Sequence, residues 1–255
     1  MKNAKWLRFF TAALFWLGLW ELAAWRLSLT VPQARLLLPP PTEVFPRLVE
    51  LGCTLPFWQT VLGSLGRVAA AFAVGAVLGC LCALLCALSP VLSALTTPLM
   101  VVVRATPVAS FILLLLLWLP GAGWVSFAAA MLMTAPIFWS NLGRAAESAD
   151  PRLLEMARAY HLSRGQVFRH IYLPALRGAL LSACESGVGL AWKAGVAAEV
   201  LTRPALAIGK MIYESKLYLE TTDLFAWTAA VVLMSLAVEK GVQTLVKKGA
   251  RSDES

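Results

Sequence analysis

The amino-acid sequence predicts an all-α polytopic membrane protein with about six transmembrane helices. Its 255 residues are 59% hydrophobic and only 14% charged, whereas soluble proteins carry roughly 25% charged residues. The apolar residues fall in long runs, and a run of about 20 residues forms a helix that crosses the hydrocarbon core of a bilayer. The net charge of +8 comes from basic residues that cluster between alternate runs, which is typical of a cytoplasmic membrane surface. These observations exclude an ordinary soluble domain and argue against a nucleic-acid-binding surface.

The first apolar run covers residues 6–25 and follows three basic residues near the amino terminus. The run resembles a secretory signal, but it ends in Glu21 and Arg26 and offers no small-residue cleavage site. We therefore expect it to be the first transmembrane helix, which enters the membrane from the cytoplasm. Residues 1–58 would then comprise this helix and an extracytoplasmic segment.

The extracytoplasmic segment, residues 27–58, is polar and rich in proline. Pro39, Pro40 and Pro41 oppose helix formation. Thr42 is the expected N-cap of a short amphipathic helix that runs to residue 51.

Residues 59–246 are expected to be the core transmembrane domain. Its predicted spans cover about 60–88, 95–119, 124–142, 179–201 and 224–246. In the second span of the chain, Gly75 and Gly79 are a pair of small residues that lets another helix approach closely. In the third span, Pro98 and Pro107 predict a kink or a broken helix.

Six spans place both termini and the polar segment 147–174 on the same side of the membrane. That side carries the larger number of lysines and arginines, including the basic tail of residues 247–255. Because basic residues accumulate on the cytoplasmic side, we expect the N-terminus, the C-terminus and the polar segment to be cytoplasmic.

Residues 150–174, the longest charged interval of the chain, predict two short helices joined by a tight connection. Asp150 is a suitable N-cap, and Pro151 suits the first helical position because its missing N–H would be unpaired there in any case. Apolar residues then recur at helical spacing along one face.

The second of these helices has its own start signal. Ser163 is followed three residues later by Gln166, which is a capping box, so we expect the helix to begin at about Arg164. Leu173 and Pro174 are expected to end it.

This polar segment resembles the cytoplasmic EAA loop of the permease subunits of bacterial ABC importers. The residues that carry the resemblance are Glu155, Met156, Ala157, Ser163, Phe168, Ile171, Leu173 and Pro174. Met156 stands where the family pattern has its second alanine, and His161 stands where it has glycine. Residues 38–44 and 191–200 are similar to the nitrate, sulfonate and taurine branch of these permeases.

The resemblance implies the type I permease fold of ABC importers, with a cytoplasmic coupling-helix hairpin. A separate ATPase would bind ATP and Mg²⁺, so this chain would carry no cofactor and no catalytic residue. The residues that the resemblance assigns to ATPase coupling are Leu153, Glu155, Ala157, Tyr160, His161, Leu162, Ser163 and Gly165. Glu155 would form charged hydrogen bonds to the ATPase, and Ala157 would let the docked helix approach closely. Leu153, Tyr160 and Leu162 would bury apolar area.

The resemblance also implies partners in the bacterial inner membrane. An extracytoplasmic solute-binding protein would deliver the solute to residues 27–58 and 202–222. Because the chain has one loop motif, two copies are expected to form a permease homodimer that engages two ATPase subunits.

The ionisable residues Arg104, Lys193 and Glu199 within the spans are candidates for the translocation path, since charged groups in a span usually face a cavity or a partner. One reading places Arg104 and Lys193 on the path, where they attract a small anion such as a sulfonate, nitrate or taurine. In the other reading, Lys193 pairs with Glu199, and Arg104 bonds carbonyls freed by the nearby proline. Arg67 is expected to snorkel to the interface, and Trp192 is a candidate for a gate.

No enzymatic motif stands out in the sequence. It lacks the GxxxxGK[ST] phosphate-binding loop, and its two histidines, His161 and His170, have no nucleophile with them. Four of the five cysteines lie in apolar runs, so a metal site is not expected. The competing function is an ion-coupled secondary transporter or channel, which would show paired carboxylates within spans and inverted repeats. The sequence offers only Glu199 deep in a span.

Overall fold

The structure of the chain is a computed structural model that describes residues 2–148 and 151–251. All regular structure in these residues is helical, which confirms the predicted all-α class. In chain order the elements are α1 (Lys2–Thr30), η1 (Ala34–Leu36), α2 (Pro41–Gly52), α3 (Leu55–Leu88), α4 (Pro90–Ala105), α5 (Val108–Trp118), α6 (Ala122–Glu147), α7 (Pro151–Ala159), α8 (Arg164–Val167), the π-helical turn η2 (Phe168–Tyr172), α9 (Leu173–Thr202), α10 (Ile208–Leu217) and α11 (Thr221–Arg251). Asp150, the predicted N-cap of α7, lies outside the described residues.

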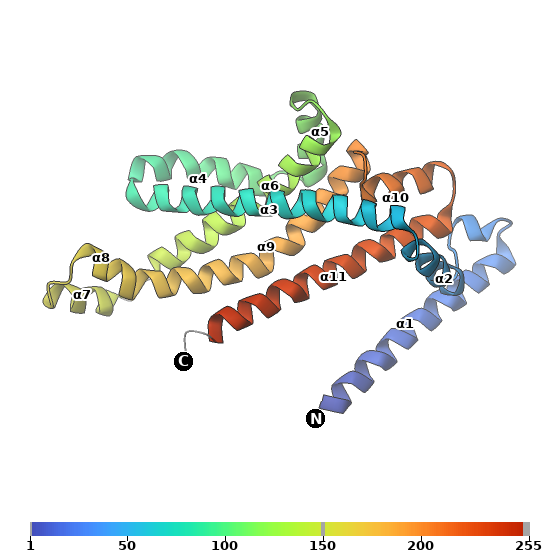
Figure 1. Ribbon diagram of the computed structural model, residues 1–255, viewed down its shortest axis with the longest axis horizontal. Helices are drawn as coiled ribbons and strands as arrows, with labels where there is room; N and C mark the ends of the chain where they lie inside the picture. Colours follow the sequence, from blue (N-terminus) through green and yellow to red (C-terminus); the bar gives the residue numbers. More distant parts are fainter. Residues whose placement is uncertain (1, 149–150, 252–255) are drawn as a thin grey trace.

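Helices occupy all six places where the sequence predicts a membrane span (Figure 1). Among the described residues, α3, α6 and the Thr221–Val246 part of α11 are long and apolar enough to cross a membrane. α4 and α5 meet the same condition together, as one span that bends by 111°. α1 and α9, with 29 and 30 residues, fill the remaining two places.

The bend between α4 and α5 confirms the predicted break in the third span. It lies at Thr106 and Pro107, whose backbone ψ angles are 129° and 132°. Pro107 has no N–H to continue the hydrogen-bond ladder of α4, and its ring disfavours a helical conformation at Thr106. Pro98 lies inside α4 without ending it, so only one of the two prolines breaks the span.

The start of α2 differs from the prediction. The helix begins at Pro41, with Pro40 as its N-cap, because proline fits the first helical turn, where no backbone N–H is needed. Thr42 does not cap α2. Its hydroxyl donates to Oε1 of Glu21 on α1 over 3.1 Å, and this bond joins α1 to α2.

The end of the polar segment also differs from the prediction. Leu173 and Pro174 do not end the second helix, because the chain passes through η2 directly into α9. The wide turn of η2 precedes Pro174, whose ring would clash with a carbonyl in a regular helix interior. The second helix of the polar segment is therefore continuous with the membrane helix α9.

A helix that the sequence did not reveal, α10, lies in the polar segment between α9 and α11. It is short and packs against both neighbouring helices. Gly209 allows this packing, because a Cβ there would lie 2.6 Å from the backbone carbonyl carbon of Glu199.

The centre of the molecule is α6, which packs most extensively against α3 and α9. Gly75 and Gly79 make the contact between α3 and α6 close. A Cβ at Gly75 would lie 2.6 Å from the carbonyl oxygen of Met131, and one at Gly79 would lie 2.7 Å from the Cβ of Phe138. The predicted role of this glycine pair in close helix packing is confirmed.

The two ends of the molecule are built from different elements (Figure 1). α7, α8 and η2 form a hairpin that extends beyond the spans; we call this the hairpin end. η1, α2, α10 and the start of α11 lie together at the opposite end, which we call the α2–α10 end. α1 contacts the rest of the chain at the α2–α10 end, and its amino-terminal part stands apart in Figure 1.

Candidate functional site

The hairpin end exposes large apolar side chains to its surroundings. Tyr160 is 76% exposed, and Leu153, Met156 and Phe168 are exposed as well. The side chain of Glu155 also lies on the surface, while Leu162 is half-buried. Exposed apolar side chains gathered with a charge are typical of a surface that binds another protein.

Ala157 lies on the inner side of the hairpin, against its own chain. It is 2% exposed, and its carbonyl accepts a 2.9 Å hydrogen bond from the N–H of Leu162 in the turn. The small side chain therefore lets the hairpin close on its own chain.

The turn of the hairpin explains the pattern of its residues. His161 has a positive φ of 50°, a left-handed conformation that glycine adopts without strain. The glycine of the family pattern at this position thus has a conformational reason. Gly165 lies in a regular helical turn with open space around it.

The predicted capping box is present at the start of α8. The N–H of Ser163 donates to Oε1 of Gln166 over 2.8 Å, and the N–H of Gln166 donates to Oγ of Ser163 over 3.4 Å. α8 begins at Arg164 as predicted.

Glu199 pairs with Arg67 and not with Lys193, so two sequence interpretations are wrong. Glu199 is completely buried and forms an ion pair with Arg67. Lys193 lies six residues before Glu199, on a different face of α9, and its side chain is exposed. Arg67 does not snorkel, because the carboxylate holds it inside.

The same carboxylate fixes the connection between α9 and α10. Glu199 Oε2 accepts from the hydroxyl of Ser64 over 2.7 Å and from the N–H of Gly209 over 3.3 Å. Oγ of Ser64 accepts from the N–H of Ile208 over 2.8 Å, and Arg67 donates to the carbonyl of Ala205 over 3.2 Å. Glu199 is therefore part of a closed structural network and does not face a path in this structure.

Trp192 also points into the interior. It is 1% exposed, and its Nε1 donates to the carbonyl of Val231 over 3.2 Å. It belongs to an aromatic core with Phe57 and Trp227. The interpretation of Trp192 as part of a gate is therefore not supported by its position.

A cavity of about 490 Å³ lies between α4, α6 and α9. Its lining consists of Val103, Arg104, Leu132, Met133, Pro136, Ile137, Ser140, Asn141, Arg144, Ser182, Ser186 and Leu190. The charged residues in this lining are arginines, Arg104 from the last turn of α4 and Arg144 from the last turn of α6. The cavity therefore combines positive charge with hydroxyl and amide groups.

Arg144 is a cavity residue that the sequence analysis did not identify. A signal for it exists: Ser140 and Arg144 are one turn apart on α6, as are Ser182 and Ser186 on α9. Lys193 does not line the cavity, but it continues the exposed face of α9 that carries Leu190.

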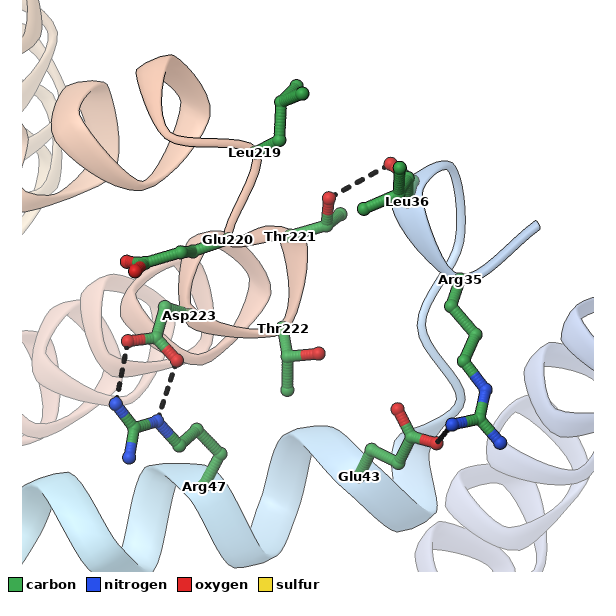
Figure 2. A pocket seen from close by; sticks show the side chains of 9 residues that line it. All are labelled: Arg35, Leu36, Glu43, Arg47, Leu219, Glu220, Thr221, Thr222 and Asp223. Atoms are coloured by element: carbon green, nitrogen blue, oxygen red, sulfur yellow. Dashed lines mark hydrogen bonds and ion pairs between the residues drawn. The ribbon is translucent and has the colours of Figure 1, made fainter. Parts of the chain in front are cut away.

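A second hollow, of about 340 Å³, lies at the α2–α10 end (Figure 2). Arg47 on α2 holds Asp223 on α11 with two hydrogen bonds, of 2.6 Å from Nε and 2.9 Å from Nη2. Bonds to Asp223, and then to Glu50, raise the pKa of Arg47 above its ordinary value. Arg35 pairs with Glu43 over 3.3 Å. This end is thus held together by its own ion pairs.

Neither end offers a place for a metal ion. Within residues 2–148 and 151–251, no cluster of His, Cys, Asp and Glu side chains could hold one.

Comparison with known protein families gives one match over most of the helical body. Residues 75–244, from α3 to α11, match the family model described as the binding-protein-dependent transport system inner membrane component.

Relatives of known name are similar over most of their length. The taurine transport system permease protein TauC of Escherichia coli (strain K12) is 25% identical over 220 residues, which cover 84% of this chain and 79% of the relative. The bicarbonate transport system permease protein CmpB of a Synechocystis strain is 24% identical, over 75% of this chain and 68% of the relative. The putative aliphatic sulfonates transport permease protein SsuC of Bacillus subtilis (strain 168) is 22% identical, over 83% and 76%.

Solved structures share the fold at lower identity. A chain of an amino acid ABC transporter crystallised with histidines superposes with a TM-score of 0.62 at 17% identity, over 74% of this chain and 94% of that chain. A chain of the inward-facing MetNI methionine ABC transporter gives 0.51 at 15% identity, over 75% and 93%. These likenesses show the fold predicted from the sequence.

Proposed function

This chain belongs to the family of binding-protein-dependent transport system inner membrane components, and so is the permease subunit of an ABC importer. We propose that a separate ATPase binds its hairpin end and that ATP hydrolysis there drives a small anionic solute through the permease. Permeases of this family carry no cofactor, and ATP with Mg²⁺ would be bound by the ATPase. The family assignment also argues against the competing function, a secondary transporter that works without an ATPase.

The observation that carries the docking proposal is the exposure of the hairpin. Tyr160 and Leu153 project from a segment that extends beyond the spans. Full burial of one such side chain stabilises a contact by about 1.5–3 kcal/mol. Glu155, which is exposed beside them, would add charged hydrogen bonds, which are stronger than neutral ones.

The connection of the hairpin to the spans supports a mechanical role. α6 leads into the hairpin, and η2 joins the hairpin to α9 without a break. α6 and α9 also form two walls of the charged cavity. Movement of the docked hairpin would therefore displace both walls together and change access to the cavity.

The charge of the cavity supports an anionic solute. Arg104 and Arg144 line it, and Lys193 lies further along the same face of α9; we propose Arg104 and Lys193 as residues of the translocation path. The relatives named for transport of taurine, bicarbonate and aliphatic sulfonates support the proposal, because each of these solutes carries an oxyanion group.

The remaining partners follow from the same arrangement. A binding-protein-dependent importer implies an ATPase and a solute-binding protein. We propose that the binding protein docks at the α2–α10 end, on residues 27–58 and 202–222. Two copies of this chain would pair in the inner membrane and engage two ATPase subunits, with both termini in the cytoplasm.

The test is co-purification of the ATPase with the permease from cells that produce the complete transporter. Glu155→Lys reverses the charge of the docking surface and is expected to lose the ATPase. Glu220→Lys, an exposed residue of the α2–α10 end, is the matched control and is expected to keep it. Retention of a coupled ATPase by Glu155→Lys would contradict the docking proposal.

A further inference from the structure

The cavity between α4, α6 and α9 has a feature that the sequence did not indicate: positive charge at two positions, at the ends of α4 and α6. Arg104 lies in the last turn of α4, after Val103, which packs near Leu132 and Met133 of α6, and Arg144 lies in the last turn of α6. No aspartate or glutamate is among the residues that line the cavity. A cleft lined by side chains of one sign of charge concentrates ions of the opposite sign.

We infer that this cavity is a binding site for small oxyanions, held by Arg104 at the end of α4 and by Arg144 at the end of α6 that leads to the hairpin. The inference rests on the proposed function and deepens it, because it names the binding residues and the chemical class of the ligand. Arg144 becomes the residue that links the solute site to the hairpin.

Among the described residues, no acidic side chain neutralises the charge of Arg104. Arg104 forms no ion pair with the acidic side chains of the described residues, although charged groups in a span usually have a partner. The break after Ala105 ends α4 and leaves the side chain of Arg104 at the cavity. An anion in the cavity would supply the missing countercharge.

The guanidinium of Arg144 is positioned by a neutral neighbour. Its Nη2 donates to Oδ1 of Asn141 over 3.1 Å, and Nδ2 of Asn141 donates to the carbonyl of Ile137 over 2.8 Å. Because the amide carries no charge, it orients Arg144 and leaves the positive charge available to a ligand.

Two hydroxyl groups in the lining of the cavity are already hydrogen-bonded within their own helices. Oγ of Ser186 donates to the carbonyl of Ser182 over 2.9 Å, and Oγ of Ser140 donates to the carbonyl of Ile137 over 3.2 Å. With these protons engaged, the two guanidinium groups are the main donors to a ligand.

The geometry of the donors selects the ligand class. A guanidinium presents parallel N–H groups that match two oxygens of a planar or tetrahedral oxyanion. Sulfonates, bicarbonate and nitrate have such oxygens, whereas a cation that lacks an oxyanion group would be repelled. The volume of about 490 Å³ lies within the range of small-molecule sites, roughly 300–1,000 Å³.

The test uses Ser186→Cys in the complete transporter, free of nucleotide and placed in nanodiscs. The thiol is treated with a sulfonate-bearing and with an ammonium-bearing methanethiosulfonate, and mass spectrometry reads the modified fraction at residue 186 alone. Each rate is divided by the rate with free cysteine. We expect the sulfonate reagent to react faster, and ethanesulfonate but not ethylammonium to protect the thiol.

The arginines are then removed one at a time. A unit charge roughly 8 Å away through water changes the ratio of the two rates by about fivefold, so Arg104→Gln and Arg144→Gln should each lower it by about that factor. Thr244→Cys on α11, which does not line the cavity, is the control. The ratio of the two rates at residue 244 should not change when either arginine is replaced. Lys240→Gln, an exposed residue on α11, should leave the ratio at residue 186 unchanged.

The outcomes separate this inference from the proposed function. Equal rates of the two reagents at residue 186, a ratio unaffected by both arginine variants, or no reaction at all would overturn the oxyanion site. The amount of bound ATPase and its ATP hydrolysis are measured in the same preparations. A transporter that keeps an active ATPase but shows no preference for the sulfonate reagent refutes the oxyanion site and leaves the docking proposal standing. Loss of the ATPase from the unmodified transporter would instead refute the docking proposal.

Discussion

The two ends of the molecule differ in the contacts that hold them together. At the α2–α10 end, Arg47 pairs with Asp223, and Glu199 pairs with Arg67. Apolar side chains are exposed at both ends, since Tyr160 is 76% exposed at the hairpin end and Tyr218 is 69% exposed at the other. The difference is that ion pairs within the chain join the helices of the α2–α10 end, whereas the hairpin end presents its apolar surface on a segment that extends beyond the spans, as a surface that binds another protein does.

This difference indicates a division of labour along the chain. A buried, fully bonded network holds helices in one arrangement, so the α2–α10 end is expected to move as a unit. The hairpin is joined to the body through α6 and η2, and its exposed surface is accessible to another protein. Substitutions at the two ends should therefore affect different properties: folding stability at one, and ATPase binding at the other.

The largest expected effect is at the buried carboxylate. Glu199→Ala leaves Arg67, the hydroxyl of Ser64 and the N–H of Gly209 without their acceptor, and breaking a buried ion pair in this way costs about 3–5 kcal/mol. Thermal unfolding of the purified permease should show a strongly reduced midpoint. Glu50→Ala, which removes a largely exposed partner of Arg47, is the control and should change the free energy of unfolding by less than about 1 kcal/mol. Equal stability of the two variants would contradict the comparison.

The next effect is in the body that joins the two ends. Gly75→Ala would place a methyl group 2.6 Å from the carbonyl oxygen of Met131, and such overpacking costs about 1–3 kcal/mol. Gly66→Ala lies on the same helix, with no other atom within 4 Å of the new Cβ, so it should not destabilise. A midpoint for Gly75→Ala that equals that of Gly66→Ala would show that α3 and α6 do not pack closely.

A smaller effect, on binding alone, is expected at the hairpin. Tyr160→Ala should leave the unfolding midpoint unchanged, because the side chain is exposed in the permease. It should weaken ATPase binding about tenfold or more, since a buried aromatic side chain contributes about 1.5–3 kcal/mol. Titration of the ATPase onto the purified permease measures this, with Tyr218→Ala at the other end as the control. Unchanged affinity for the ATPase would place Tyr160 outside the docking surface.

The smallest effect is expected at the turn of the hairpin. His161→Gly should stabilise the turn slightly, by about 0.5–1 kcal/mol, because a positive φ is strained for other residues. His161→Val should destabilise it, since a β-branched residue tolerates this conformation poorly. Protection of the N–H of Leu162 from hydrogen exchange reports the difference. Higher protection in the valine variant would contradict the role of backbone conformation here.

Much of the fold could be predicted because the determining signals are local. The lengths of the apolar runs located the membrane helices, Pro107 located the break in the third span, and Ser163 with Gln166 located the start of α8. Each signal acts within a few residues on the hydrogen bonds of one helix. The α10 helix was missed because its stability depends on packing against α9 and α11.

The candidate site could be predicted only in part, because its contacts are distant in sequence. Glu199 and Arg67 are 132 residues apart, and no local pattern reveals their pairing. Lys193 and Glu199 were paired by proximity in sequence, although residues six apart on a helix do not share a face. Arg144 could be found in the cavity only once the crossing of α4, α6 and α9 was known.

The most direct test of the account is photo-crosslinking from both ends in cells that produce the complete transporter. A photoreactive phenylalanine is placed at position 160 in the hairpin or at position 218 in the turn before α11. The account predicts that position 160 crosslinks to the ATPase subunit and that position 218 does not. Crosslinking of the ATPase from position 218, or its absence from position 160, would contradict the claim that the hairpin is where the ATPase binds.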